Sequence, residues 1–132
     1  MNASYLVDTD WAIHFFNGSP EVTRRLETIY GHGVGISIIS LAELYEGVFY
    51  SNQPEENEEA LQEFLRRVEV IEVDDATCRI FARERGRLRR MSQRLGDFDL
   101  LIGATALRHS LTLLTNNRRH FEMIENLTLE SV

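Results

Sequence analysis

Short apolar runs alternate with longer amphipathic stretches along this chain of 132 residues. The runs are rich in β-branched residues and end in polar ones, which is typical of strands covered on both faces, and they span residues 5–7, 34–39, 68–73, 111–114 and 127–129. Between them, apolar residues recur at helical spacing over residues 11–16, 22–30, 41–50, 60–67, 76–95 and 100–107. Because strands alternate with helices, we expect an α/β fold: a single three-layer α/β/α domain with a small, mainly parallel sheet and 127–129 at its edge.

Two of the predicted helices carry further signals. Pro54 and the glutamates after it predict a helix start, because acidic side chains in a first turn complement the helix dipole. In the long helix 76–95, apolar residues recur on one face that we expect to be buried, made of Cys78, Phe81, Ala82, Leu88, Met91 and Leu95. Arginines recur on an adjacent face and form a stripe, at Arg79, Arg83, Arg87, Arg90 and Arg94.

The composition fits one globular domain spanning residues 1–132. Apolar residues make up 43% of the chain and charged residues 27%, unlike the composition of disordered segments. Cys78 is the only cysteine, which excludes an intrachain disulfide and a cysteine-rich zinc site and suits a reducing compartment. No apolar run approaches the ~18 residues of a membrane helix, and the first ten residues lack the basic region of a signal peptide, so we predict a cytoplasmic protein with no membrane contact.

The basic residues are distributed very unevenly. All fourteen are arginines, and seven of them fall between residues 79 and 94, where Glu84 is the only acid, although the net charge of the chain is −7. A local field depends on the distribution of charge rather than on its sum, so this stripe is a candidate surface for RNA or for a protein partner. The alternative is a solvated helix face whose arginines pair with glutamates or cover apolar surface.

Acidic side chains recur where the predicted strands end. Asp8 and Asp10 follow the first strand, Glu43 lies four residues beyond Ile39, and Asp97 and Asp99 open a helix that we expect to run from Phe98 to His109, where either acid could cap it. Asn116 and Asn117 follow the run 111–114. Ligands of open α/β sheets bind at these carboxyl ends.

Two ionised carboxylates 4 Å apart repel by about 4 kcal/mol at an effective dielectric of ~20, so a pocket that gathers several of them needs protons or a divalent cation. Oxygen ligands select Mg²⁺ or Mn²⁺, and an acidic pocket beside an arginine stripe predicts a metal-dependent nuclease.

Four segments of the chain, in order, resemble the PIN-domain ribonucleases, most closely the VapC-type toxins of bacterial toxin–antitoxin systems. They are Leu6-Val7-Asp8-Thr9, Ser40-Leu41-Ala42-Glu43-Leu44 with Gly47, Gly96-Asp97-Phe98-Asp99-Leu100-Leu101-Ile102 with Ala104, and Leu114-Thr115-Asn116-Asn117 with Phe121. The resemblance implies a PIN-like α/β/α sandwich and an endoribonuclease that hydrolyses RNA phosphodiester bonds with Mg²⁺ or Mn²⁺. It also implies a homodimer and a cognate antitoxin, which in this family commonly supplies a basic side chain to the acidic pocket.

By the same resemblance, Asp8, Glu43 and Asp99 would bind the metal, and Asn117 would complete the catalytic set. The family often has a further acid after the fourth strand, whereas this chain has Asn117 there, and His120 stands before Phe121 where relatives commonly carry an acid. A second metal is therefore not implied, and Asp10 could partly restore the missing charge. Asn117 could hold a metal-bound water or stabilise a turn.

Simpler interpretations compete for several of these residues. We expect Asp97 to cap a helix, Glu46 to be solvated, Cys78 to be buried, and the aromatic residues Trp11, Phe15 and Phe16 to lie in a core or interface. The four histidines show no ligand spacing.

Two other functions compete with the nuclease hypothesis. The segment from Tyr5 to Trp11 also resembles haloacid-dehalogenase-like phosphatases, in which Asp8 would attack phosphorus and Asp10 would act as acid or base. Those enzymes commonly need a later lysine, as a receiver domain does, and this chain has none. A third possibility is a catalytically inactive PIN-like binding module that has lost its ligand at Asn117.

Overall fold

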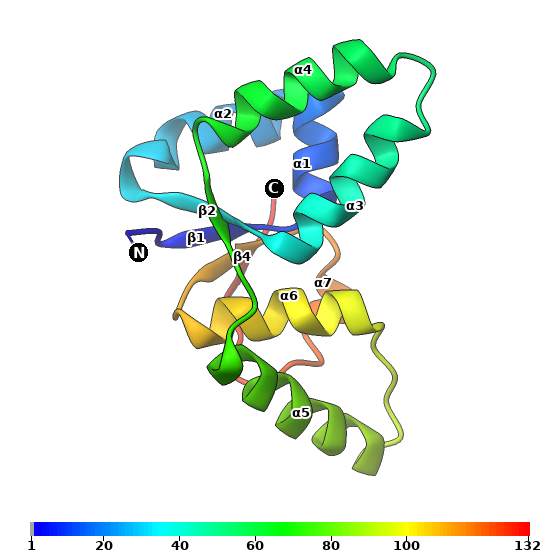
Figure 1. Ribbon diagram of the computed structural model, residues 1–132. Helices are drawn as coiled ribbons and strands as arrows, with labels where there is room; N and C mark the ends of the chain where they lie inside the picture. The colour runs from blue at the N-terminus through cyan, green and yellow to red at the C-terminus, as the bar shows by residue number, and fades with distance from the viewer. Residues whose placement is uncertain (1) are drawn as a thin grey trace.

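The computed structural model describes residues 2–132, and its centre is a five-stranded parallel sheet (Figure 1). The strands are β1 (Tyr5–Val7), β2 (Val34–Ser37), β3 (Glu69–Ile71), β4 (Thr112–Leu114) and β5 (Leu129–Glu130). Their spatial order is β3-β2-β1-β4-β5, and every neighbouring pair is parallel. β5 lies at the edge, as the run 127–129 predicted, and β1 occupies the centre, which brings its carboxyl end beside those of β2 and β4.

Helices cover both faces of the sheet, which confirms the predicted three-layer α/β/α architecture. They are α1 (Thr9–Phe16), α2 (Pro20–Ile29), α3 (Ile38–Phe49), α4 (Pro54–Leu65), α5 (Asp75–Arg90), α6 (Asp97–Arg108) and α7 (Arg118–Phe121), with a 3₁₀ turn, Tyr30–His32, before β2. In Figure 1, α1, α2 and α4 lie above the sheet with most of α3, whereas α5 and α6 lie below it. Pro54 opens α4 as predicted.

Two separate apolar cores result from this layering. Consecutive strand residues point to opposite faces, so Leu6 packs with α5, α6 and α7, whereas Val7 packs with α1 to α4. Leu113 and Leu114 divide between the two cores in the same way. Trp11 is fully buried in the upper core, where the partly buried rings of Phe15 and Phe16 both lie 5.5 Å from that of Phe64. The expectation that the aromatic residues of α1 pack in a core is confirmed.

The predicted strand 34–39 is too long by two residues. β2 ends at Ser37, whose hydroxyl accepts a hydrogen bond from the Ile39 amide at 3.0 Å and so caps α3. The chain therefore passes from strand to helix without a loop. As a result, Glu43 lies in the second turn of α3 and close to the end of the strand.

The predicted buried face of the long helix is wrong in part. α5 ends at Arg90, so Met91 and Leu95 are not helical, and Cys78, Ala82 and Met91 are exposed. Inward positions are taken instead by polar residues whose hydrogen bonds are satisfied. Thr77 is buried and bonded to Asp74, and Glu84 pairs with Arg87. Of the predicted face, Leu88 and Leu95 are buried and Phe81 is half-buried.

Between Asn2 and Val132, no helix combines the length and the apolarity that crossing a membrane requires.

Candidate active site

Asp8 lies at the centre of the carboxyl edge of the sheet. It follows β1 directly and caps α1, and only 4% of its surface is exposed. Its Oδ1 accepts a hydrogen bond from the Thr9 amide at 2.8 Å, and its Oδ2 accepts one from the hydroxyl of Thr115 at 2.7 Å. Thr115 follows β4, so β1 and β4 are joined at their carboxyl ends through this carboxylate.

Burial raises the pKa of Asp8 from 3.8 to about 8, and the negative charge of Asp10 adds to the shift. The hydrogen bonds from Thr115 and Thr9 oppose it, because they favour the ionised form. Without a cation nearby, Asp8 therefore holds its proton at neutral pH. A positive charge placed against this carboxylate would remove the cost of ionising it.

Glu43 is joined to the same edge through Thr9. The Thr9 hydroxyl donates to Glu43 Oε1 at 2.7 Å and lies 2.8 Å from the hydroxyl of Ser40, which is buried in α3. The amide of Thr9 contacts Asp8, so this one residue connects the two acids. Helix α3 therefore presents Glu43 toward the end of β1, as predicted.

Asp99 reaches the edge from the opposite face through α7, a short helix that the sequence pattern did not predict. The Asn117 amide donates to the Thr115 hydroxyl at 2.9 Å, and the side-chain Nδ2 of Asn117 lies 2.9 Å from Nδ1 of His120. Nδ1 of His120 in turn lies 3.4 Å from Oδ2 of Asp99. Asp99 is placed by the first turn of α6, which has Gly96 as its N-cap.

The predicted site residues thus lie along one continuous line of polar contacts, which we call the carboxyl-edge chain. It consists of Glu43, Thr9, Asp8, Thr115, Asn117, His120 and Asp99. The three acids are separated by hydroxyl, amide and imidazole groups rather than in mutual contact. In agreement with that spacing, no three Asp, Glu, His or Cys side chains within residues 2–132 form a cluster that could hold a metal ion by themselves.

The other acids that the sequence singled out have different surroundings. Asp10 belongs to the site, because its carboxylate lies 3.4 Å from the Thr115 hydroxyl and accepts a hydrogen bond from the Asn116 amide at 3.2 Å. Asp97 is exposed and paired with Arg85, and it makes no capping hydrogen bond, so its predicted role as a cap is wrong. Glu46 is exposed, as expected for a solvated side chain.

The hydroxyl-bearing residues Thr9, Ser40 and Thr115 were not assigned a role from the sequence. Each lies near the carboxyl end of a strand or in the following helix, and each is buried or half-buried. A polar residue directly after an apolar strand is the signal that could have identified Thr9 and Thr115. Asn116 has a structural role, because its Oδ1 accepts a hydrogen bond from the buried indole of Trp11 at 3.0 Å.

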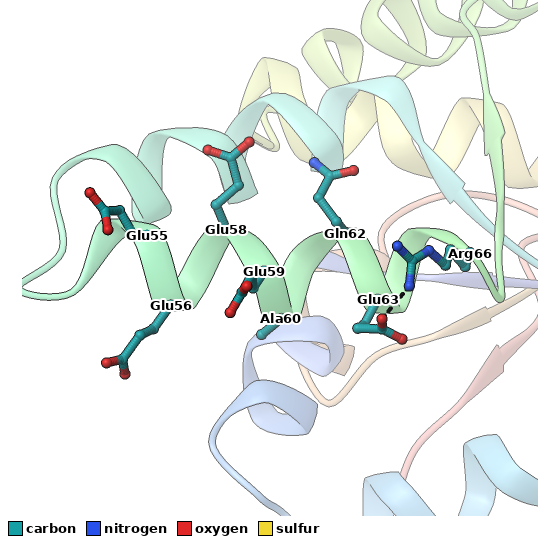
Figure 2. Close-up of a pocket in the computed structure, with 8 residues that line it drawn as sticks. All are labelled: Glu55, Glu56, Glu58, Glu59, Ala60, Gln62, Glu63 and Arg66. Carbon is teal, nitrogen blue, oxygen red and sulfur yellow. Dashed lines mark hydrogen bonds and ion pairs between the residues drawn. The ribbon is translucent and has the colours of Figure 1, made fainter.

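Two hollows on the surface differ in their relation to this site. One of about 300 Å³ lies between α1, α3 and α4 and reaches Glu43, with Ile13, Phe16 and Leu44 among its lining residues. The other, of about 790 Å³, lies along α4 (Figure 2), where its glutamates, Gln62 and Arg66 project from a single helix in different directions. The side chains along α4 do not converge, and no candidate site residue lines this second hollow. Of the two hollows, the first is therefore the one that is continuous with the candidate site.

Fold and site together define a small α/β/α protein with a carboxylate-bearing sheet edge. The PIN domain family model matches residues 5–126, and the chain belongs to the PIN-domain family, in its VapC branch. It is 36% identical over 130 residues to "Ribonuclease VapC2" of Rickettsia felis and 29% identical over 126 residues to "tRNA(fMet)-specific endonuclease VapC" of Shigella flexneri, with 96% of each chain covered in both cases. The crystal structure of VapBC2 from Rickettsia felis bound to a DNA fragment from its promoter superimposes with a TM-score of 0.92 at 33% identity, over 97% of this chain and 98% of that one.

The family resemblance stated from the sequence is therefore confirmed. The competing phosphatase hypothesis finds no support, because the segment from Tyr5 to Trp11 on which it rested falls within the PIN domain match.

Proposed function

We propose that this chain is a cytoplasmic endoribonuclease that hydrolyses RNA phosphodiester bonds with Mg²⁺ or Mn²⁺, and that it is the toxin of a toxin–antitoxin pair. The observation that carries the proposal is the carboxyl-edge chain, which places Asp8, Glu43 and Asp99 on one line of contacts at the end of the sheet. The relatives named ribonuclease or endonuclease VapC support the activity. We also propose that residues 1–132 form one PIN-like domain and that the chain forms a homodimer.

The donor atoms at this edge suit a hard divalent cation. They are carboxylate, hydroxyl and amide oxygens, and the most buried of the acids, Asp8, carries a pKa that a nearby positive charge would lower. Mg²⁺ usually keeps several waters and takes only one or two carboxylates directly. The acids of this site are held apart by hydroxyl groups, and they therefore suit an ion that keeps part of its water shell. They suit less well an ion that is fully enclosed by protein ligands.

Each residue of the site has a definite part in this proposal. Asp8, Glu43 and Asp99 would hold the ion directly or through water. Asp10 and Asn117 would orient the attacking water. When bound, the ion supplies charge neutralisation of the phosphodiester and lowers the pKa of a water molecule.

The test is incubation of the purified protein with tRNA, rRNA and mRNA in Mg²⁺, in Mn²⁺ or in EDTA. We expect cleavage in either metal and none in EDTA. Asp8→Ala, Glu43→Ala and Asp99→Ala should each reduce cleavage at least about a hundredfold while leaving the circular dichroism spectrum unchanged. Glu46→Ala is the matched control, since Glu46 is an exposed acid on the same helix as Glu43.

Two results would contradict the proposal. Cleavage by the wild type that survives EDTA would exclude the metal mechanism. If metal left both the melting temperature and the RNA unchanged, the inactive binding module would be the better hypothesis, and the absence of a carboxylate at Asn116 and Asn117 would explain it.

We place the antitoxin over the hollow that reaches Glu43. Its lining is largely apolar, and Phe49 and Tyr50, at the end of α3, are 60% and 88% exposed. A segment with apolar side chains would fill it and bring a basic residue to the neighbouring acids. Titration with the co-expressed partner should inhibit cleavage, and Ile13→Glu should weaken that inhibition, since Ile13 lines the hollow and is 46% exposed. Inhibition that is unchanged by this substitution would place the contact elsewhere.

A further inference from the structure

The structure divides the arginines of residues 79–94 into two groups. Three are engaged in ion pairs: Arg79 with Asp75, Arg85 with Asp97, and Arg87 with Glu84 and Glu125. The other four are exposed, and their side chains make no ion pair or hydrogen bond with any residue from 2 to 132; they are Arg83, Arg89, Arg90 and Arg94. The predicted stripe is therefore interrupted at Arg87, which is turned inward and bonded to the Met123 carbonyl. It is also wrong at Arg94, which lies in the loop after α5 because the helix ends at Arg90.

Two of the unengaged arginines face a common groove. A hollow of about 510 Å³ lies between the last turns of α5, the following loop and the start of α6, and Arg89, Arg94 and Gln93 line it. Arg85 forms its inner wall and fixes the loop, because one guanidinium nitrogen donates to the Leu95 carbonyl at 2.8 Å and another pairs with Asp97. With Asp97 taken up by Arg85, the charges of Arg89 and Arg94 are not neutralised.

The groove extends to the start of α6, the helix that carries Asp99 in its first turn. Its far wall is Gly96 and Asp97, and Asp99 follows two residues later in the same first turn of α6. In Figure 1, the loop that joins α5 to α6 runs on the side of the molecule where α6 begins and α7 lies. The N-terminus of α6, a helix of 12 residues, adds a positive partial charge at the same place.

The opposite layer of the molecule has the opposite charge. Helix α4 carries five glutamates and no basic residue, and it lies across the sheet from α5 (Figure 1). A polyanion is therefore repelled from the α4 side and attracted to the α5 side. Phosphate groups are the anions that exposed arginines bind most readily, through paired N–H donors.

We propose that the groove lined by Arg89 and Arg94 binds the sugar-phosphate backbone of the RNA substrate and leads the strand to the acids of the carboxyl edge. This inference rests on the proposed nuclease function and adds to it the surface that holds the substrate. Two phosphate contacts to a single strand contribute roughly 1.4 to the slope of log Kd against log salt concentration. That contribution corresponds to about a 25-fold difference in affinity between 1 M and 0.1 M salt.

The experiment measures binding in EDTA, so that the RNA stays intact, by fluorescence anisotropy of a fluorescein-labelled, unstructured RNA of 25 nucleotides. The groove variant is Arg89→Gln with Arg94→Gln. The matched control is Arg83→Gln with Arg90→Gln, which removes two exposed, unengaged arginines of α5 that do not line the groove. The groove variant should lose roughly 25-fold in affinity at 0.1 M salt, and its slope of log Kd against log salt should fall by about 1.4. The control should lose less than about threefold.

Substitution by lysine separates charge from folding. Arg89→Lys with Arg94→Lys should retain most of the salt slope, and all variants should keep the wild-type melting temperature within about two degrees, since surface changes of this kind are nearly neutral. Equal losses in the groove and control variants would overturn the proposal in favour of a diffuse positive field. A groove variant that binds RNA normally but changes oligomeric state in sedimentation, or loses only its affinity for the antitoxin, would overturn it in favour of a protein contact.

Failure of this inference is distinguishable from failure of the proposed function. If no RNA is cleaved in Mg²⁺ or Mn²⁺, the nuclease proposal fails. If RNA is cleaved and the groove variant binds and cleaves the 25-nucleotide RNA as the wild type does, only the groove is excluded.

Discussion

Replacing Asp8 by Asn should stabilise the metal-free protein, and the gain should grow with pH. The change keeps the size of the side chain and an oxygen that can accept the Thr9 amide. The amide group of Asn can donate to the Thr115 hydroxyl, which can then turn its own proton toward Asp10, 3.4 Å away. What is removed is the cost of ionising a buried carboxyl beside another acid.

The magnitude follows from the pKa of Asp8, which is about 8 in the folded chain against an ordinary value of 3.8. A carboxyl with a raised pKa binds its proton more tightly in the folded state, so between pH 4 and pH 8 the free energy of unfolding falls as pH rises. Each pKa unit corresponds to about 1.4 kcal/mol, so the penalty at pH 9 is on the order of 6 kcal/mol. Below pH 4 it vanishes, because the carboxyl is protonated in both states.

The assay is urea unfolding of both proteins in EDTA at half-unit steps from pH 4 to pH 9. The difference in the free energy of unfolding, variant minus wild type, should be near zero at pH 4 and should reach several kcal/mol at pH 9. Glu56→Gln is the control, since Glu56 is an exposed acid of α4, and its difference should stay flat. Parallel curves for Asp8→Asn and the wild type over the whole range would show that Asp8 is ionised at little cost, which would refute the argument from burial.

Two further changes test the fold. Gly33→Ala should lower the free energy of unfolding by roughly 2 kcal/mol, because Gly33 has a φ of +84° and an added Cβ would collide with the Asn2 carbonyl. Gly31→Ala is the control and should cost much less, because a Cβ at Gly31 meets open space. Equal losses of the free energy of unfolding in urea would contradict this prediction. Asp74→Ala should lower the melting temperature by a few degrees at pH 7, since Asp74 accepts hydrogen bonds from the Thr77 amide and hydroxyl, which lower its pKa to about 2. That deficit should be complete above pH 4 and disappear as pH falls through 2; a deficit independent of pH would exclude the ionised cap.

The sequence predicts the layers of this fold well and the ends of its elements less well. Period and composition locate five strands and six helices, because strands covered on both faces have continuous apolar runs. At Ser37 the pattern fails, since Ile38 and Ile39 extend the apolar run while the Ser37 hydroxyl already caps a helix. In α5 it fails because the buried Thr77 and the half-buried Glu84 have hydrogen-bond partners of their own, and polarity alone does not reveal a satisfied polar group.

At the site, the acids were predictable and their connections were not. Asp8, Glu43 and Asp99 stand out because carboxylates recur after successive strands. Thr9 and Thr115 do not stand out, since a threonine is common at any strand end, and only the folded structure shows that their hydroxyls connect the acids. The short helix α7 was missed for another reason: four residues are too few to show a helical period.

The position of Asp8 explains why a stable fold would retain a buried acid. Both oxygens of its carboxylate already accept a hydrogen bond, from Thr9 and Thr115, yet the pKa is still raised, because burial and Asp10 outweigh those two bonds. The protein therefore holds a carboxyl whose ionised form requires a positive charge, and within residues 2–132 Asp8 forms no ion pair with a basic side chain. A divalent cation provides that charge, and at neutral pH its binding would release the proton of Asp8. The buried carboxyl of Asp8, which makes the metal-free protein less stable at high pH, would thus also make this edge of the sheet a cation site.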